Sequence, residues 1–179
     1  WESSLGSVLA VKRLLDIVGS GLALLLGLPF LAVVALLVYL DDPGPIFYTQ
    51  TRVGQDGRLF PFYKFRSMRV GADKMKDQLI QQNESKDGVI FKMKNDPRIT
   101  RVGKYLRRFS VDEAPQILNV FLGDLSIVGP RPPLPREVAL YSLEDRKRLH
   151  VKPGLTCFWQ IQGRSDIPFK DQVRLDLQY

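Results

Sequence analysis

An apolar run near the N-terminus constrains this chain more than any other feature. Residues 17–40, IVGSGLALLLGLPFLAVVALLVYL, include no charged side chain. As one straight helix at about 1.5 Å per residue, the run would reach roughly 36 Å, which is enough to cross the hydrocarbon core of a bilayer. Two interpretations stay open: a single-pass anchor, or a helical hairpin that enters and leaves through one leaflet. A signal peptide fits less well, because the run is long and no small-residue cleavage site follows it.

The flanks and the middle of the run favour the hairpin. Pro29 falls mid-run, where a proline removes a backbone hydrogen bond and kinks a helix. Lys12 and Arg13 precede the run, and five more cations follow it within residues 52–69. Because positive flanks stay cytoplasmic, we expect a re-entrant membrane helix with its break at Pro29. The acidic residues at its two ends should then lie at the membrane interface: Asp16, Asp41 and Asp42.

Length and composition limit the rest of the chain. At 179 residues it has room for one ordinary domain and a small appendage, and 45% apolar residues are enough for a core. We expect the membrane hairpin to occupy residues 1–42 and a cytoplasmic domain residues 43–179. The net charge of +7 implies anionic partners, such as nucleic acid, phospholipid headgroups or phosphorylated substrates. The only cysteine, Cys157, excludes an internal disulfide, and we expect the chain to be a fragment of a longer protein.

The cytoplasmic part is predicted to be of the α/β class in its α+β form, mostly helical with a short β-hairpin or sheet. Asp56-Gly57 is a two-residue turn signal between aromatic and β-branched runs, which predicts the hairpin. An apolar helix should start just after Ser110 and stop at Gly123. The remaining expected elements are a polar helix over 73–86, a basic helix over 98–108, a charged surface helix over 136–150, and turns with short strands over 151–165.

An acidic pair, Asp112 and Glu113, stands at the expected start of the apolar helix. Acids there often only stabilise the helix dipole, by about 0.3–1 kcal/mol. A carboxylate facing a phosphate can instead attack phosphorus and form an acyl-phosphate. The local pattern fits either a capping box between Ser110 and Glu113 or a cap by Asp112 itself, because Pro115 suits the second.

Cations surround the acidic pair in the sequence and favour the chemical interpretation. Two adjacent carboxylates among cations suit a diphosphate bound with Mg²⁺, which prefers one or two carboxylates plus phosphate oxygens. Arg131, between two prolines, could belong to a proline-rich peptide ligand, but it is better suited to bidentate phosphate contact. The sequence does not decide whether Arg107 or Arg108 faces the site. The full set of expected cations is Lys64, Arg66, Arg107, Arg108 and Arg131.

These motifs together resemble the monotopic phosphoglycosyl transferases, bacterial sugar transferases that start glycoconjugate synthesis on polyprenyl phosphate. The resemblance spans nearly the whole chain. It rests on the basic pair before an apolar hairpin with its proline, and then on KFRSM, DPRITRVGKYLRR, SVDEAPQILNVFLGDLSIVGPRP, KPGLTCFWQIQGRS and VRLDLQY. Two departures stand out. Leu28 replaces the serine that many members have before the proline, and the membrane-associated helices that normally follow the last motif are missing.

The resemblance implies a ping-pong transferase with Mg²⁺ as cofactor. Asp112 would be the nucleophile and Glu113 its magnesium-binding and acid–base partner, while Lys64, Arg107, Arg131 and Asp176 would serve the active site. The donor would be a UDP-sugar, usually with glucose or galactose, and the acceptor undecaprenyl phosphate. The enzyme would lie at the cytoplasmic face of the bacterial inner membrane, in contact with phospholipid and without nucleic acid. The longer GPRPPLPREV form resembles the catalytic domain of a large exopolysaccharide or O-antigen initiating enzyme, and a homodimer stays open.

Two rival functions come from other classes. A membrane-anchored, nucleic-acid-binding regulator would use the positive charge, but the acidic pair would repel a polyanion. A non-catalytic scaffold of an envelope-assembly complex is the other. Release of UMP from a UDP-sugar separates the transferase from both.

Overall fold

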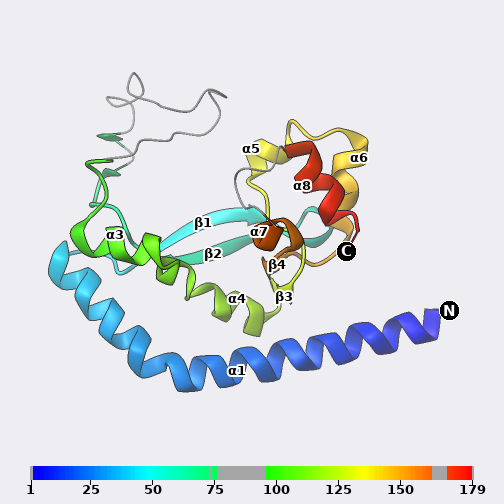
Figure 1. The fold of residues 1–179 in the computed structure, drawn as a ribbon, viewed down its shortest axis with the longest axis horizontal. Helices are drawn as coiled ribbons and strands as arrows, with labels where there is room; N and C mark the ends of the chain where they lie inside the picture. The colour runs from blue at the N-terminus through cyan, green and yellow to red at the C-terminus, as the bar shows by residue number, and fades with distance from the viewer. Residues whose placement is uncertain (1, 73, 76–95, 163–168, 179) are drawn as a thin grey trace. The chain divides into compact units, whose positions relative to one another are not determined.

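A computed structural model describes residues 2–72, 74–75, 96–162 and 169–178 (Figure 1). The predicted polar helix over 73–86 lies outside the described residues except for positions 74 and 75. Helices and short strands alternate along the chain, with more helix than strand, as predicted. The elements are α1 Glu2–Asp41, β1 Phe47–Val53, η1 Gln55–Gly57, β2 Leu59–Phe65, α3 Arg101–Arg108, η3 Val111–Glu113, α4 Gln116–Leu122, β3 Ser126–Val128, α5 Pro135–Val138, α6 Leu143–Arg146, η4 Lys147–His150, β4 Gly154–Thr156, α7 Phe158–Gln162 and α8 Phe169–Asp176.

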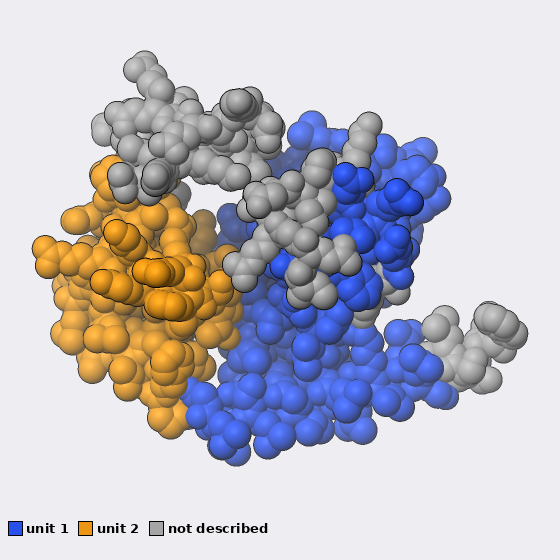
Figure 2. All heavy atoms as spheres, viewed as in Figure 1, with its two compact units in different colours: residues 1–28, 49–63, 115–179 blue, residues 29–48, 64–114 orange. Residues whose placement is uncertain are grey.

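The chain forms two compact units that are interleaved in the sequence (Figure 2). The first unit contains residues 1–28, 49–63 and 115–179, and the second contains residues 29–48 and 64–114. Helix α1 and the hairpin each contribute to both units. The predicted boundary between residues 42 and 43 separates membrane from cytoplasmic segments, which is a different division, and it stays a prediction.

Helix α1 continues through Pro29 without a non-helical residue, so the expected helix–break–helix is a single helix here. Over Gly6–Asp41 it is long and apolar enough to cross a membrane, judged by length and composition, and only 11% of its most apolar window is buried. A core helix of a soluble protein would bury most of such a window. The large side chains that α1 exposes are apolar, among them Leu14, Leu22, Leu26, Phe30 and Leu36.

Two charged side chains in the first half of α1, Lys12 and Asp16, are bonded within the first unit. Lys12 donates to the Ser126 hydroxyl and, at 2.9 Å, to the Val128 carbonyl in β3. Asp16 is buried and accepts a hydrogen bond from the Ile127 amide at 2.9 Å. Because these polar groups are bonded inside the protein, the surface that α1 leaves exposed is apolar.

Arg13 caps the end of another helix. Its guanidinium donates to the carbonyls of Val120 at 2.7 Å and Phe121 at 2.8 Å, in the last turn of α4. Of these two carbonyls, that of Val120 also accepts from the C-cap Gly123 amide at 3.2 Å, and a cation suits the negative end of the helix dipole. Arg13 therefore joins α1 to α4 within the first unit.

The second half of α1 packs into the second unit. Val34 and Val38 share a buried cluster with Phe65 of β2 and Leu106 of α3. Asp41 accepts from the Val102 amide at 2.8 Å, in the first turn of α3. Asp42, just after α1, accepts from the Val70 amide at 3.0 Å. Of the three acids expected at a membrane interface, Asp16 is buried, and Asp41 and Asp42 are half-buried and bonded to the protein.

The predicted hairpin is confirmed: β1 and β2 pair in a two-stranded sheet (Figure 1). Asp56 and Gly57 have positive φ angles of 53° and 80°, as the turn signal requires. The loop between the strands, residues 54–58, is longer than two residues. The Gly54 amide closes it by donating a hydrogen bond to the Arg58 carbonyl at 2.7 Å. In the first unit, two phenylalanines of β2 pack on α4 and the segment after it, in a cluster of Phe60, Phe62, Val120 and Leu125.

A second small sheet pairs β3 with β4 in parallel, with Ser126 opposite Gly154 and Val128 opposite Thr156. This confirms one short strand in the range 151–165, where turns and short strands were expected. The helix α7 over Phe158–Gln162 was not predicted. The single charged helix predicted over 136–150 is wrong, because three short helical segments, α5, α6 and η4, occupy this range. The Ser142 side chain accepts from the Asp145 amide at 3.2 Å and so starts α6 anew.

Asn119 joins the hairpin to α4 and generates a stability prediction. Its fully buried side chain donates to the Pro61 carbonyl at 2.7 Å and accepts from the Tyr63 amide at 3.2 Å. Replacing Asn119 with alanine leaves both backbone groups of β2 unsatisfied, and we expect a loss of about 2–4 kcal/mol. Chemical denaturation of the detergent-solubilised protein measures this loss. Leu118→Ala, at an exposed position of the same helix, is the control, and an equal loss in both variants would contradict the prediction.

Candidate active site

The acidic pair lies in a single 3₁₀ turn, η3, and not at the start of an α-helix. Helix α4 begins at Gln116 with Pro115 as its N-cap. Both predicted caps are therefore wrong: Ser110 is left-handed, with φ 57°, and makes no side-chain capping bond, and Asp112 does not cap α4. Asp112 therefore does not lie at the positive end of a helix dipole, and its charge state depends on its neighbours.

Asp112 is 9% exposed, and burial raises the pKa of its carboxyl above the ordinary value. Glu113 raises this pKa further through like charge, whereas Lys64 and Arg107 lower it. Burial is the largest of these effects, and Lys64 is the largest opposing one. Asp112 is thus a carboxylate with little water around it, whose ionised form is favoured by two cations.

Lys64 contacts the acidic pair directly. Its ammonium group lies 2.6 Å from a Glu113 carboxylate oxygen. The β2 strand places Lys64, and η3 places Glu113, which is 49 residues further along the chain. This ion pair confirms that the sequence-predicted lysine and acidic pair meet in space.

Arg107 acts electrostatically on the acidic pair, whereas Arg108 lies against an aromatic ring. Arg107 acts on the pKa of Asp112, and its Nε donates to the Ser67 hydroxyl at 3.0 Å. The Arg108 guanidinium instead lies over the Phe109 ring at 5.7 Å. The side chain of Ser67 therefore orients Arg107, a role that sequence reasoning missed because a serine in KFRSM carries no specific signal.

Arg66, a predicted phosphate-binding residue, is paired elsewhere. It is buried, and its guanidinium lies 3.2 Å from the Asp42 carboxylate and also donates to the Asp42 carbonyl. These contacts fix the chain just after α1. Of the two predicted phosphate-binding residues Lys64 and Arg66, only Lys64 contacts the acidic pair.

Arg131 and Asp176 belong to the other compact unit. Arg131 is exposed in the loop after β3, with its guanidinium 5.8 Å from the centre of the buried Trp159 ring. Asp176 is buried in α8 and forms an ion pair with Arg148. Burial raises the pKa of Asp176 to about 6 although Arg148 lowers it, so at neutral pH the ion pair is mostly formed.

Sequence reasoning missed Arg148 and Trp159. Arg148 lies in the charged stretch RKR at 146–148, a pattern typical of a solvated helix face, yet its side chain is only 4% exposed. Only the position of α8 reveals that this cation has a buried partner. Trp159 carries a weak signal, because a tryptophan near an arginine-bearing loop can stack on it.

A divalent cation would find two adjacent carboxylates here, Asp112 and Glu113. Within the described residues no group of three or more histidine, cysteine or acidic side chains could hold a metal. Mg²⁺ needs only one or two carboxylates when substrate phosphates and water complete its shell. The residues present therefore fit Mg²⁺ if the substrate carries phosphate, and Glu113 would share its carboxylate between Lys64 and the ion.

Comparison with known proteins gives a consistent result. Residues 7–179 match the family of bacterial sugar transferases. The galactosyl transferase CpsE of Streptococcus agalactiae serotype III (strain NEM316) is 46% identical over 97% of this chain and 38% of its own length. The undecaprenyl-phosphate galactose phosphotransferase of Salmonella typhimurium (strain LT2) is 41% identical over 94% of this chain and 36% of its own.

A shorter relative is covered more fully. The exopolysaccharide production protein ExoY of Rhizobium meliloti (strain 1021) is 39% identical over 94% of this chain and 76% of its own length. The chain thus spans little more than a third of the first two relatives and three quarters of this one. Nearly all of this sequence is covered by the family match, and the chain belongs to the bacterial sugar transferases.

Proposed function

We propose that this chain transfers a sugar 1-phosphate from a UDP-sugar to undecaprenyl phosphate and releases UMP. This would be the first membrane step in the synthesis of an exopolysaccharide, O-antigen or capsule. One observation carries the proposal: Asp112 is a buried carboxylate next to a lysine-bound Glu113, and the positive charges of Lys64 and Arg107 lower its pKa. The names of the relatives support it, since two are named for undecaprenyl-phosphate transfer and a third for exopolysaccharide production.

The proposed first step is attack by an Asp112 carboxylate oxygen on the sugar-bearing phosphorus. The bond from this phosphorus to the bridging oxygen breaks, and UMP leaves with that oxygen and its electron pair. A phosphosugar then remains bound to Asp112 as an acyl-phosphate. Burial favours this attack because a poorly hydrated carboxylate loses little water as it approaches phosphorus.

In the second step a phosphate oxygen of undecaprenyl phosphate attacks the same phosphorus. The acyl–oxygen bond to phosphorus breaks, Asp112 is restored as a carboxylate, and the sugar is left on a polyprenyl diphosphate. Lys64 and Arg107 supply positive charge beside Asp112 in both steps, where charge builds up on the phosphoryl oxygens. The same site therefore serves both halves of a ping-pong reaction.

Glu113 would hold Mg²⁺ together with phosphate oxygens of the donor. Bound there, the ion would neutralise charge on the diphosphate and on the departing UMP. Lys64 keeps Glu113 in place at 2.6 Å, so the carboxylate is ordered before any substrate arrives. We assign Arg131 to the diphosphate and leave Arg66 out of the site, because Arg66 is paired with Asp42.

The donor sugar is proposed to be galactose or glucose. Galactose is the sugar in the names of the relatives from Streptococcus agalactiae, Salmonella typhimurium and Erwinia amylovora. A panel of UDP-sugars tested for UMP release in the presence of undecaprenyl phosphate identifies the donor. Release of UMP also separates the transferase from a nucleic-acid-binding regulator and from a non-catalytic scaffold.

A re-entrant membrane helix is part of the proposal, and the bonds at both ends of α1 support it. Lys12, Arg13 and Asp16 at one end are bonded to residues 120–128, which follow the apolar run in the sequence. Asp41 at the other end is bonded to Val102. Both ends of the apolar run are thus bonded to folded protein, as a helix that enters and leaves through one leaflet requires. The apolar surface that α1 exposes between them suits the lipid.

The nucleophile is tested by replacing Asp112 with asparagine. We expect turnover to be abolished with the fold retained, because an amide cannot form the acyl-phosphate. Mass spectrometry of the parent enzyme mixed with UDP-sugar alone should locate a phosphosugar on Asp112. An adduct on any other residue, or full activity in the variant, would overturn this assignment.

The metal role is tested in Glu113→Gln, which keeps the shape of the side chain and removes its charge. We expect activity to fall by about 100-fold or more, with saturation at a higher Mg²⁺ concentration, because one carboxylate ligand is lost. A titration of UMP release against Mg²⁺ in parent and variant measures both effects. A parent enzyme that works equally well in chelator would show that Glu113 has no metal to hold.

The membrane topology is tested with a membrane-impermeant thiol label in sealed cells. A cysteine is placed at Ser3 in a variant with Cys157 replaced by serine, and a cysteine at exposed Glu144 is the control for the folded domain. We expect neither cysteine to be labelled from outside, because Lys12 and Arg13 disfavour translocation by about 2.5–3.5 kcal/mol for each charge at the bilayer centre. Labelling at position 3 alone would show a spanning helix.

A further inference from the structure

The loop that carries Arg131 has few backbone amides. The hydrogen bonds that hold its backbone in place are therefore almost all accepted by its carbonyl groups. In the sequence GPRPP at 129–133, three of five residues are prolines, which have no amide hydrogen to donate. The position of this loop therefore depends on the donors that its carbonyls find. These donors can be identified one by one, and all lie in the same compact unit as the loop.

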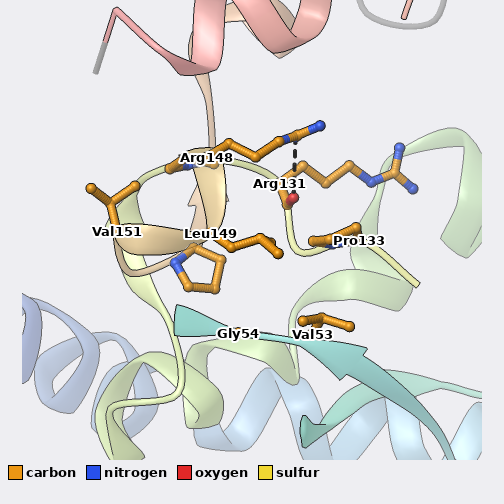
Figure 3. Close-up of a pocket in the computed structure, with 9 residues that line it drawn as sticks. Val53, Gly54, Arg131, Pro133, Arg148, Leu149 and Val151 are labelled. Carbon is orange, nitrogen blue, oxygen red and sulfur yellow. Dashed lines mark hydrogen bonds between the residues drawn. The ribbon is translucent and has the colours of Figure 1, made fainter. Parts of the chain in front are cut away.

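Four successive carbonyls of the loop each accept a hydrogen bond from a different place. Backbone amides hold the outer two: Gly154 donates to Pro130 at 2.8 Å, and Val53 donates to Pro133 at 2.9 Å. Guanidinium groups hold the inner two: Arg148 donates to Arg131 at 3.4 Å, and Arg52 donates to Pro132 at 3.0 Å. Figure 3 shows the Arg148 guanidinium against the Arg131 carbonyl, while the Arg131 side chain extends away from it.

Both guanidinium groups are buried and fixed by further contacts. Arg148 is 5% exposed and forms an ion pair with Asp176, whose side chain is 1% exposed. Arg52 is 6% exposed, donates to the Gln50 side chain at 2.9 Å and lies 5.3 Å from the Phe62 ring centre. Burying a cation is expensive, so two buried arginines that meet on one loop call for a specific reason.

The space beside the loop is nearly filled. A cavity lined by Arg131, Arg148, Val53 and Pro153 has a volume of only about 10 Å³, room for no more than one water molecule (Figure 3). With its carbonyls bonded and its underside packed, the loop has little freedom to shift. The Trp159 ring then limits the directions in which the exposed Arg131 guanidinium can point.

We propose that Arg148 and Arg52 are positioning residues for Arg131. They fix the Arg131 carbonyl and the carbonyl of the next residue, Pro132, so that the Arg131 guanidinium is aligned for bidentate contact with the donor diphosphate. Asp176 acts through Arg148, and this replaces its expected role as a substrate-binding residue. The inference rests on the proposed function, in which Arg131 contacts the diphosphate.

Alignment matters here because a guanidinium fork has a fixed geometry. Two parallel N–H groups match two phosphate oxygens only over a narrow range of angles. A misplacement of 1 Å at a group that binds a reacting phosphate can cost about 100-fold in rate. A small movement of the Arg131 backbone would therefore be measurable in the kinetics.

The test is a double-mutant cycle on UMP release. Arg148→Lys keeps a positive charge, but its shorter side chain should not hold one nitrogen against both the Asp176 carboxylate and the Arg131 carbonyl, as Arg148 Nη2 does. We expect kcat/KM for the UDP-sugar to fall by about 10-fold to 100-fold, in the same parameter that Arg131→Ala lowers. In the Arg131→Ala background the same change should cost no more than about twofold, because the residue being positioned is gone.

Arg52→Lys, combined with Arg131→Ala in the same way, gives a second, independent double-mutant cycle. It tests the positioning role if Arg148→Lys does not fold. Lys147→Gln, at the exposed neighbour of Arg148, is the control and should leave kcat/KM and the unfolding temperature unchanged. An equal fold-loss in the parent and Arg131→Ala backgrounds would overturn the positioning role. A parent enzyme that releases no UMP would instead refute the proposed function itself, so the two failures are distinguishable.

Discussion

The hydrogen bonds that α1 makes with its few polar side chains determine much of the remaining structure. Arg13 holds the last carbonyls of α4, and Asn119 in α4 holds the Pro61 and Tyr63 backbone of β2. The strand β2 then continues to Lys64, which contacts Glu113. A chain of direct contacts and covalent continuity thus leads from the apolar helix to the candidate catalytic acids. It also uses the polar side of α1 inside the protein and leaves its apolar surface outside.

The charge state of Asp112 results from a balance between burial and neighbouring charge. Burial raises its pKa, and so does Glu113, while Lys64 and Arg107 oppose them. The lysine that bonds Glu113 is also the main cation that favours ionised Asp112. A nucleophile with little hydration and nearby positive charge suits attack on a phosphate, because the transition state gathers negative charge at the same place. The two acids therefore have different roles: Asp112 is buried, and Glu113 is tied to Lys64.

The arginines of this chain fall into distinct classes once their partners are known. Arg13 caps a helix, Arg66 fixes the end of α1, and Arg148 and Arg52 hold the loop around Arg131. Arg107 is the arginine that most lowers the pKa of Asp112. The net charge of +7 alone suggested a general affinity for anions, but several of these cations bind the protein itself. The positive charge available to a substrate is smaller and more localised than the composition implies.

The sequence by itself determined the features that depend on neighbours along the chain. The apolar run, the Asp56-Gly57 turn and the basic helix that became α3 all follow from local pattern. It misplaced the start of α4, because the capping pattern at Ser110 did not reveal that this residue is left-handed. Only the tertiary structure decided that Arg66 pairs with Asp42 and that Arg148 is buried against Asp176. Partners 24 to 28 residues apart share no local pattern, so burial and charge pairing become definite only when the chain folds and removes these groups from water.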